Sequence, residues 1–223
     1  MHNAGAEPGR WFHHGVLRLL EVSDLACVRG ERTLFSGVSF TLEPGALLRV
    51  AGPNGSGKTS LLRIVCGLML QAEGEVRWRG ENIRSLREEY WRDLNYIGHL
   101  NALKDDLTGL ENIQIGAALS GRGVTREAAL RALGDLGVAQ CAELPARVLS
   151  QGQRRRVALA RLIVLRGTPL WVLDEPFPGL DAEAVDFVSA RLAQHITQGG
   201  SVVLTTHQEV AIDARQHRID LAA

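Results

Sequence analysis

Short apolar runs alternate with longer segments of helical period along most of the chain. The apolar runs are rich in leucine and β-branched residues and are bounded by turn residues, which predicts β-strands. The expected strands cover residues 18–22, 38–42, 46–51, 75–79, 94–98, 170–173, 201–205 and 218–221. The runs 170–173 and 201–205 lack a regular polar alternation, which is typical of strands buried on both faces of a sheet.

The segments between these runs predict helices. They cover residues 57–68, 111–119, 126–136, 151–167 and 181–195. Thr125 is placed to cap the third of them and Gly137 to end it. Strands that alternate with helices predict an α/β domain with a largely parallel sheet, into which a helical segment of roughly residues 100–165 is inserted. Residues 1–16 show no period and are expected to form a flexible leader, so that residues 17–223 form a single domain.

The composition fits a globular domain and narrows the class of function. Of 223 residues, 45% are hydrophobic and 22% are charged, which excludes a disordered chain. Lys plus Arg and Asp plus Glu number 25 each, so binding to nucleic acid is not expected as the main task. No apolar run reaches the ~18 residues that span a bilayer, and the N-terminus lacks the apolar core of a signal peptide. The default compartment is therefore the cytoplasm.

The three cysteines are widely spaced and contain no C-x-x-C pair. This spacing predicts neither a zinc site nor covalent attachment of haem. Reduced thiols in an intracellular protein are the expected state.

A glycine-rich turn joins the strand 46–51 to the following helix. It matches G-x-x-x-x-G-K-[ST], the pattern of a phosphate-binding loop, at every position. Glycines let backbone N–H groups turn toward a β-phosphate, the lysine adds a mobile positive charge, and the threonine hydroxyl can bind Mg²⁺. A chance glycine loop is the alternative, but the strand and helix around it favour a nucleoside triphosphate. The residues are Gly52, Pro53, Asn54, Gly55, Ser56, Gly57, Lys58 and Thr59, followed by Ser60.

Two carboxylates follow the buried strand 170–173. Asp174 stands at the carboxyl end of this strand, where it can hold Mg²⁺ beside the phosphate loop. Glu175 is adjacent and can act as the general base that activates an attacking water. The alternative is an acidic strand end that caps the next turn, which the phosphate loop in the same chain disfavours.

A second helix start with anion-binding character lies at Ser150. Ser150 is a good N-cap, Gly152 permits close approach of the backbone, and Gln153 completes an L-S-x-G-Q sequence. Taken alone, the pattern describes an ordinary capped helix equally well. The arginines that follow are ambiguous in the same way, because a solvated basic face has the same pattern. They are Arg154, Arg155, Arg156 and Arg161.

Five motifs in a fixed order carry a resemblance to a known family. The phosphate loop, L-S-x-G-Q, apolar-D-E-P, G-L-D and strand-T-T-H follow one another as in the ATP-binding subunits of ABC transporters. Within that family, the chain most closely resembles the haem-exporter ATPases of the cytochrome c maturation system. The most diagnostic stretch is 25–35, and further similar stretches are 52–62, 96–99, 107–112, 154–162 and 204–208.

The resemblance implies a fold and a set of ligands. The fold is that of a P-loop ABC ATPase, with a mostly parallel core sheet, an antiparallel β subdomain and a helical subdomain. The ligands are ATP and Mg²⁺, with Thr59 and Asp174 on the metal. Glu175 and His207 would be the catalytic residues, although a histidine that caps a strand end is the alternative for His207.

The same resemblance implies partners. In this family ATP lies between two subunits, so that Ser150, Gly152 and Gln153 would contact the ATP of a second copy. Asp181 matches the turn that couples the two sites. The active state would be a homodimer docked on integral membrane subunits, peripheral to the cytoplasmic face of the inner membrane. Nucleic acid is not an expected partner, and haem is not expected to bind this chain directly.

Three positions depart from the family's pattern. The glutamine that usually helps to hold Mg²⁺ and touches the membrane partner falls at Leu100, and neither His99 nor Asn101 is an assured substitute. The aromatic residue that usually stacks on adenine falls near Arg29, whose guanidinium could stack on the base or face solvent. Gln151 stands where the signature usually has a small residue.

The sequence therefore predicts an ATP-hydrolysing subunit that supports export of haem, or release of a haem-carrying chaperone, in cytochrome c biogenesis. One alternative is the ATPase of another ABC exporter, for lipids or drugs, which would have the same motifs. A soluble ABC-type ATPase is a further alternative, but such proteins usually carry a long coiled coil or two cassettes, which do not fit in 223 residues. The last alternative is a scaffold protein that binds nucleotide without hydrolysing it.

Overall fold

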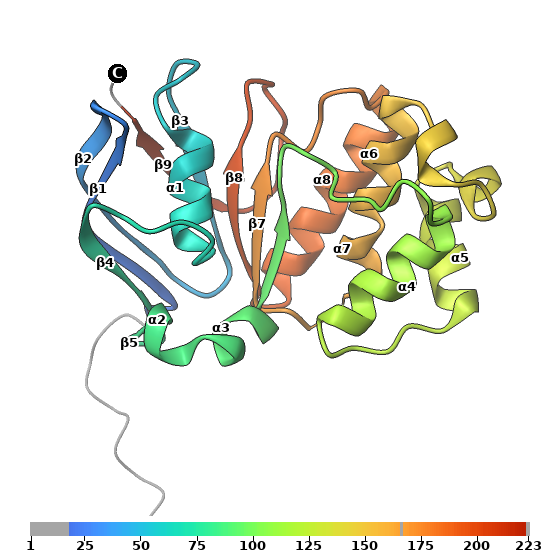
Figure 1. Ribbon diagram of the computed structural model, residues 1–223, viewed down its shortest axis with the longest axis horizontal. Coiled ribbons are helices and arrows are strands. Elements are labelled where there is room, and N and C mark those ends of the chain that lie inside the picture. Colours follow the sequence, from blue (N-terminus) through green and yellow to red (C-terminus); the bar gives the residue numbers. More distant parts are fainter. Residues whose placement is uncertain (1–17, 166, 222–223) are drawn as a thin grey trace, which may run out of the picture.

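The computed structural model describes residues 18–165 and 167–221, which form two sheets and a set of helices that pack mainly against the larger sheet (Figure 1). The proposed leader, 1–16, lies outside the described residues. The larger sheet is parallel and has five strands in the order β6-β7-β8-β3-β9. Its strands are β3 (Ala46–Ala51), β6 (Leu94–Ile97), β7 (Leu170–Asp174), β8 (Ser201–Thr205) and β9 (Arg215–Asp220).

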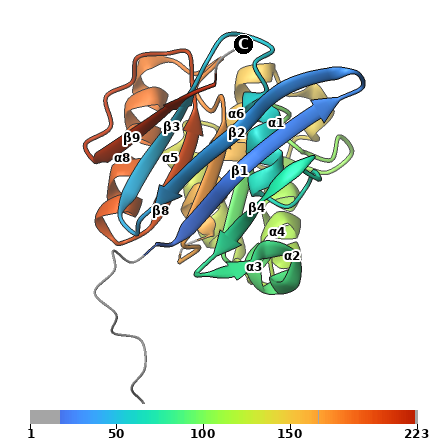
Figure 2. The ribbon, with the colours of Figure 1, turned by 90° about the vertical axis from the view of Figure 1, so that its left-hand side faces the viewer.

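The smaller sheet is antiparallel, with four strands in the order β2-β1-β4-β5. In Figure 2, β1 and β2 run as a long hairpin with α1 behind them. Its strands are β1 (Leu20–Arg29), β2 (Arg32–Leu42), β4 (Glu73–Trp78) and β5 (Glu81–Asn82). A parallel core sheet with a separate antiparallel sheet and helices is the expected α/β class, which is thus confirmed.

The hairpin is longer than the sequence predicted, since only residues 18–22 and 38–42 of it were expected to be strands. The pairing of β1 with β2 shifts register three times, between Val22 and Leu25, between Leu25 and Cys27, and between Cys27 and Val28. Each shift breaks the two-residue alternation of buried and exposed side chains. The end of β1 and the start of β2, next to the hairpin turn, therefore lack the periodic signal.

The helices lie on both faces of the parallel sheet. In Figure 1, α4 to α7 gather on the side away from the antiparallel sheet. The longer helices are α1 (Lys58–Val65), α4 (Gly109–Leu119), α5 (Arg126–Asp135), α6 (Gln151–Leu159) and α8 (Ala182–Thr197). Short helices are α2 (Ile83–Leu86), α3 (Glu88–Arg92) and α7 (Arg161–Val164), with 3-10 turns at Ala139–Cys141 and Ala146–Val148. The helix predicted over 151–167 is thus two helices that meet at Ala160, and the short α2 and α3 were not predicted.

The core consists of two clusters, one on each face of the parallel sheet. Trp171 and Leu173 of β7 point into the cluster formed with α4 to α8. Leu170 and Val172 point into the other cluster, with α1 and the antiparallel sheet. This two-residue alternation buries β7 on both faces, as its continuous apolar sequence predicts. The three cysteines are free and buried, and no helix in the described part of the chain is long and apolar enough to span a membrane.

Candidate nucleotide-binding site

The loop between β3 and α1 has a conformation that only glycine adopts easily. Gly52 has φ of 143° and Gly57, the N-cap of α1, has φ of 96°. A Cβ atom on Gly52 would lie 2.7 Å from the carbonyl oxygen of Leu221 and from Oγ of Ser56. The chain therefore bends tightly enough for several backbone N–H groups to face one point at the start of α1, which is the geometry that binds phosphate.

Lys58 is the first residue of α1, and its side chain folds back over the loop. Its Nζ donates hydrogen bonds to the carbonyl oxygens of Gly52 at 2.8 Å and Pro53 at 3.0 Å. The ammonium is thus held above the loop, where it can meet the phosphates of a nucleotide.

Asp174 is fixed by two hydroxyl groups at the carboxyl edge of the parallel sheet. Thr59 Oγ1 donates to Oδ2 of Asp174 at 2.8 Å, and Thr205 Oγ1 donates to Oδ1 at 2.7 Å. Asp174 is 1% exposed, and its strand neighbour across the sheet is Thr205. The Thr59 hydroxyl and the free lone pairs of Asp174 offer the hard oxygen ligands that Mg²⁺ prefers, so these residues fit a magnesium site.

Glu175 has a strained backbone and a nearly buried side chain. Its φ is 50°, an uncommon value for a residue other than glycine, and its N–H donates to Thr205 Oγ1 at 3.0 Å. Oε2 accepts a hydrogen bond from the backbone N–H of His207 at 3.3 Å. Oε1 lies 3.6 Å from Nε2 of His207 and has no hydrogen-bond partner within the described chain. One carboxylate oxygen is therefore buried and unpaired in the described chain, so it keeps the lone pairs that a general base needs.

One cavity of about 570 Å³ brings these groups together. It contains most of the phosphate loop, both carboxylates and His207, although the loop precedes the other residues by more than a hundred positions in sequence. The lining residues are Arg29, Leu34, Asn54, Gly55, Gly57, Lys58, Thr59, Ser60, His99, Asp174, Glu175, Pro178, His207 and Gln208. The volume and the mixed polar lining suit a nucleotide.

The structure distinguishes the three residues at the position of the missing glutamine. Leu100 is 81% exposed, and its neighbour Asn101 accepts a hydrogen bond from Nη1 of Arg155 at 3.1 Å. His99 alone of the three lines the nucleotide cavity. Arg29 also lines this cavity from the end of β1, which is compatible with stacking on a base.

Ser150, Gly152, Gln153 and Asp181 do not line this cavity. Ser150 and Gln153 form a capping box, in which Ser150 Oγ accepts from the N–H of Gln153 and Gln153 Oε1 accepts from the N–H of Ser150. A Cβ atom on Gly152 would lie 2.7 Å from the carbonyl oxygen of Gly179, so glycine is needed there for packing. The start of α6 is thus a second polar surface, whose Ser150, Gly152 and Gln153 do not line the nucleotide cavity.

Asp181 caps α8 by accepting a hydrogen bond from the N–H of Ala184 at 2.9 Å. This bond and the ion pair with Arg156 lower the pKa of Asp181. The carboxylate of Asp181 therefore connects the start of α8 to Arg156 of α6, which lies four residues after Gly152.

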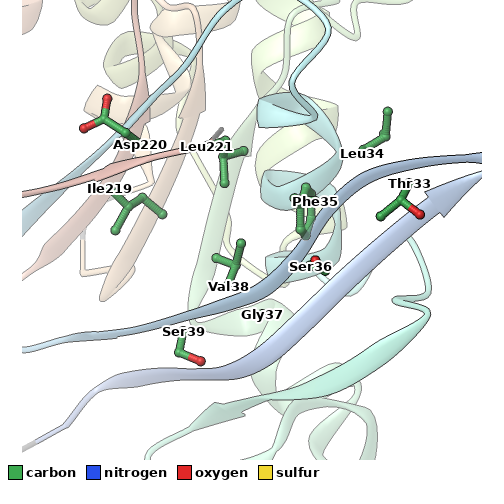
Figure 3. Close-up of a pocket in the computed structure, with 10 residues that line it drawn as sticks. All are labelled: Thr33, Leu34, Phe35, Ser36, Gly37, Val38, Ser39, Ile219, Asp220 and Leu221. Atoms are coloured by element: carbon green, nitrogen blue, oxygen red, sulfur yellow. The ribbon is translucent and has the colours of Figure 1, made fainter. Parts of the chain in front are cut away.

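A second cavity, of about 600 Å³, lies between β2 and the end of β9 (Figure 3). Leu34 and Phe35 line this cavity and also pack against Gly57 of the phosphate loop. A Cβ atom on Gly57 would lie 2.9 Å from the ring of Phe35. Among the described residues that line it, Asp220 is the only carboxylate, and it is paired with Arg218. The residues predicted for phosphate binding and hydrolysis, Lys58, Thr59, Asp174, Glu175 and His207, therefore gather in the first cavity and not in this one.

The structure adds two site residues that the sequence did not single out. Thr205 orients both Asp174 and Glu175, and the T-T-H motif that contains it was its only signal. Arg155 is buried beside the same two residues, but in the sequence it is one of three consecutive arginines with nothing to separate it from the others.

Comparison with known proteins identifies the family. The family model described as ABC transporter matches residues 35–178, more than half of the chain. Proteins named cytochrome c biogenesis ATP-binding export protein CcmA are similar over most of their length. The one from Nitrosospira multiformis is 55% identical over 193 residues, which cover 86% of this chain and 93% of the relative. Those from Nitrosomonas europaea and Pseudomonas aeruginosa are 52% and 46% identical, covering 88% and 89% of this chain and 92% and 97% of the relatives.

Solved structures show the same fold. An ATP-binding subunit of an ABC transporter matches with a TM-score of 0.75 and 27% identity, covering 85% of this chain and 79% of that chain. A dimeric bacterial ABC transporter cassette matches with a TM-score of 0.80 and 24% identity, covering 92% and 94%. These matches confirm the predicted P-loop ABC ATPase fold. The chain therefore belongs to the ABC transporter family and, within it, to the cytochrome c biogenesis ATP-binding export proteins.

Proposed function

We propose that the chain binds and hydrolyses ATP to power an export complex of cytochrome c biogenesis. The observation that carries the chemistry is the cavity in which Lys58, the Thr59–Asp174 pair and Glu175 lie together. The names of the relatives support the biological role. Hydrolysis then serves haem export or the release of a haem-carrying chaperone, and haem does not bind this chain itself.

The phosphate loop binds the nucleotide. Its N–H groups and the start of α1 receive the β-phosphate, and Lys58 exchanges the carbonyl oxygens of Gly52 and Pro53 for phosphate oxygens. Asn54, Gly55 and the other loop residues supply the backbone cradle, with Ser60 in the first turn of the helix. Arg29 stacks on the base at the mouth of the cavity.

Hydrolysis takes place at the carboxyl edge of the sheet. Thr59 and Asp174 hold Mg²⁺, which when bound neutralises charge on the phosphate oxygens. Glu175 accepts a proton from water through its unpaired Oε1, while the water oxygen bonds to the γ-phosphorus and the bond to the ADP oxygen breaks. His207 beside Glu175 orients the carboxylate and donates to the γ-phosphate.

The second polar surface requires a second copy of the chain. Ser150, Gly152 and Gln153 lie outside the cavity of their own subunit, so we assign them to the ATP bound by the partner, with Asp181 linking the two sites. The active state is then a homodimer that closes on ATP and reopens after hydrolysis. It acts at the cytoplasmic face of the inner membrane, where integral membrane subunits of the exporter receive the motion.

Deletion of the gene and complementation test the proposal. Loss of covalently bound haem from c-type cytochromes is expected in the deletion strain, measured by haem staining after electrophoresis. The wild-type gene should restore the stain and Glu175→Gln should not, at equal protein levels on an immunoblot. Normal c-type cytochromes in the deletion strain would instead assign the ATPase to another exporter, and rescue by Glu175→Gln would show that hydrolysis is not required.

A further inference from the structure

Arg155 is a buried cation in the middle of the helix that Ser150 caps. It lies in α6, is 5% exposed, and has no carboxylate side chain as a hydrogen-bond partner in the described chain. Burial lowers the pKa of its guanidinium, and the nearby charges of Asp174 and Glu175 oppose this shift. A guanidinium keeps its charge in such surroundings, so the side chain must satisfy its donors inside the protein.

The guanidinium binds backbone carbonyl oxygens at the ends of two strands. Nε donates to Pro176 at 3.0 Å and Nη2 donates to Asp174 at 3.0 Å and to Glu175. Nη1 donates to the carbonyl oxygen of Gly98 at 2.9 Å, just after β6. Each nitrogen of the planar fork is thus used, which a lysine ammonium could not reproduce.

These bonds hold the strained backbone of Glu175. A residue with φ of 50° keeps this conformation only if its surroundings impose it. The N–H of Glu175 is fixed by Thr205 Oγ1, and its carbonyl oxygen is fixed by Arg155. Together they determine the direction in which the side chain leaves the backbone, and its buried Oε1 has no hydrogen-bond partner in the described chain.

The same side chain joins the two polar surfaces. Arg155 lies on the helix that begins at Ser150, and Asn101 and Gly98, which it also binds, flank the cavity residue His99. A movement of α6 therefore displaces the hydrogen-bond partners of this guanidinium, which are Glu175 and the two residues on either side of His99. The neighbouring arginines do not make this connection, since Arg154 pairs with Asp105 at the surface.

We infer that Arg155 is a positioning residue for Glu175, and that it transmits the state of the partner's ATP, at the start of α6, to the hydrolytic carboxylate of its own subunit. This inference rests on the proposed function and concerns how its two half-sites communicate. ATP binding by the phosphate loop does not involve Arg155, because none of its partners belongs to that loop. Loss of its hydrogen bonds should therefore lower turnover and cooperativity while leaving affinity for ATP intact.

The test compares Arg155→Lys and Arg155→Met with the wild type in the assembled complex with its membrane subunits. Arg126→Gln is the control, because Arg126 is an exposed arginine of the same helical region, paired only with Glu143 in the described structure. Arg155→Lys should lower kcat on the order of tenfold to a hundredfold, as displacement of a catalytic group does. KM for ATP should change by less than about threefold, because the contacts that bind ATP equally in the ground state and the transition state are unchanged. The Hill coefficient for ATP should fall toward one, and the control should match the wild type.

Two further measurements separate the possible failures. A folded Arg155→Lys protein with unchanged kcat and Hill coefficient, or with kcat and KM changed in parallel, would overturn the inference. If Arg155→Met does not fold, Arg155→Lys still decides. Glu175→Gln serves as the reference: normal hydrolysis in it refutes the proposed function, whereas loss there with normal Arg155→Lys refutes only the positioning role. In the double variant, Arg155→Lys should add no further loss to Glu175→Gln, since both act on the same carboxylate.

Discussion

The nucleotide cavity and the start of α6 are both rich in polar groups, but they are built differently. In the cavity, Asp174 and Glu175 are largely buried and are held by Thr205 and other side chains from distant parts of the chain. At the start of α6, Ser150 and Gln153 satisfy each other and remain next to solvent. The groups in the cavity are thus brought together by the fold of one chain. At the start of α6, by contrast, the groups of one chain form only the hydrogen bonds of a helix cap. This difference supports the proposal that a second copy supplies the ligand for the helix start.

The largest effect is expected from Glu175→Gln, which keeps the shape of the side chain and removes its basicity. A general base contributes roughly a hundredfold to ten-thousandfold, so kcat for ATP should fall about a thousandfold. ATP should remain bound, because the phosphate loop is untouched, and gel filtration with ATP should show an accumulated dimer. Glu73→Gln, on the exposed end of β4, is the matched control. Unchanged turnover in Glu175→Gln would remove Glu175 from the mechanism.

Lys58→Ala should act on binding instead of on the chemical step alone. Removal of a charged contact to the β- and γ-phosphates should weaken ATP binding about a hundredfold, or about 3 kcal/mol. Isothermal titration calorimetry measures this affinity directly. Lys104 is the only other lysine of the chain and its side chain is exposed, so Lys104→Ala is the natural control. Equal ATP affinities for the two variants would contradict the role of Lys58.

The two regions also differ in how far they could be predicted from sequence. The phosphate loop and the carboxylates at the end of β7 are contiguous motifs whose neighbours in sequence fix their place, so the sequence alone predicts Lys58 and Asp174 as site residues. The sequence does not distinguish the three consecutive arginines 154–156. Only the fold buries Arg155. It also pairs Arg154 with Asp105 and Arg156 with Asp181. Their different roles depend on burial, which a run of like charges does not encode.

Local geometry limits prediction in a second way. The sequence could not choose among His99, Leu100 and Asn101, because all three follow the same strand. The path of the loop after β6 decides: Asn101 turns to Arg155, Leu100 faces solvent, and His99 lines the cavity. The bulges in β1 hid half of a hairpin for a similar reason, since they erase the periodicity on which a strand prediction depends.

His195 is a titratable residue that lies outside both polar regions. His195 of α8 stacks on Trp171 with ring centroids 3.8 Å apart, and burial lowers the pKa of His195 from 6.5 to about 4. Between these values the unfolded chain binds a proton that the folded chain does not. The free energy of unfolding should therefore fall as the pH is lowered, by about 2 kcal/mol between pH 7 and pH 4.5.

Urea unfolding at the two pH values measures this effect. In His195→Phe, an aromatic ring is kept and the titrating group is removed, so the fall in stability between pH 7 and pH 4.5 should be smaller by about that amount. ATP affinity at pH 7 should stay the same, because His195 does not line the cavity. An identical loss of stability in variant and wild type would show that other groups cause the acid sensitivity.

The smallest effect sharpens the comparison most, because the described part of the chain contains two capping boxes of the same design. Ser150 with Gln153 caps α6, and Thr108 with Glu111 caps α4. Ser150→Ala and Thr108→Ala each remove one cap and should each lower the free energy of unfolding by about 1 kcal/mol, measured with urea. If Ser150 also contacts the partner's γ-phosphate, only Ser150→Ala should reduce ATP hydrolysis, by about tenfold, which corresponds to one lost hydrogen bond to a charged group. Equal activities in the two variants would mean that the start of α6 is a capped helix and nothing more.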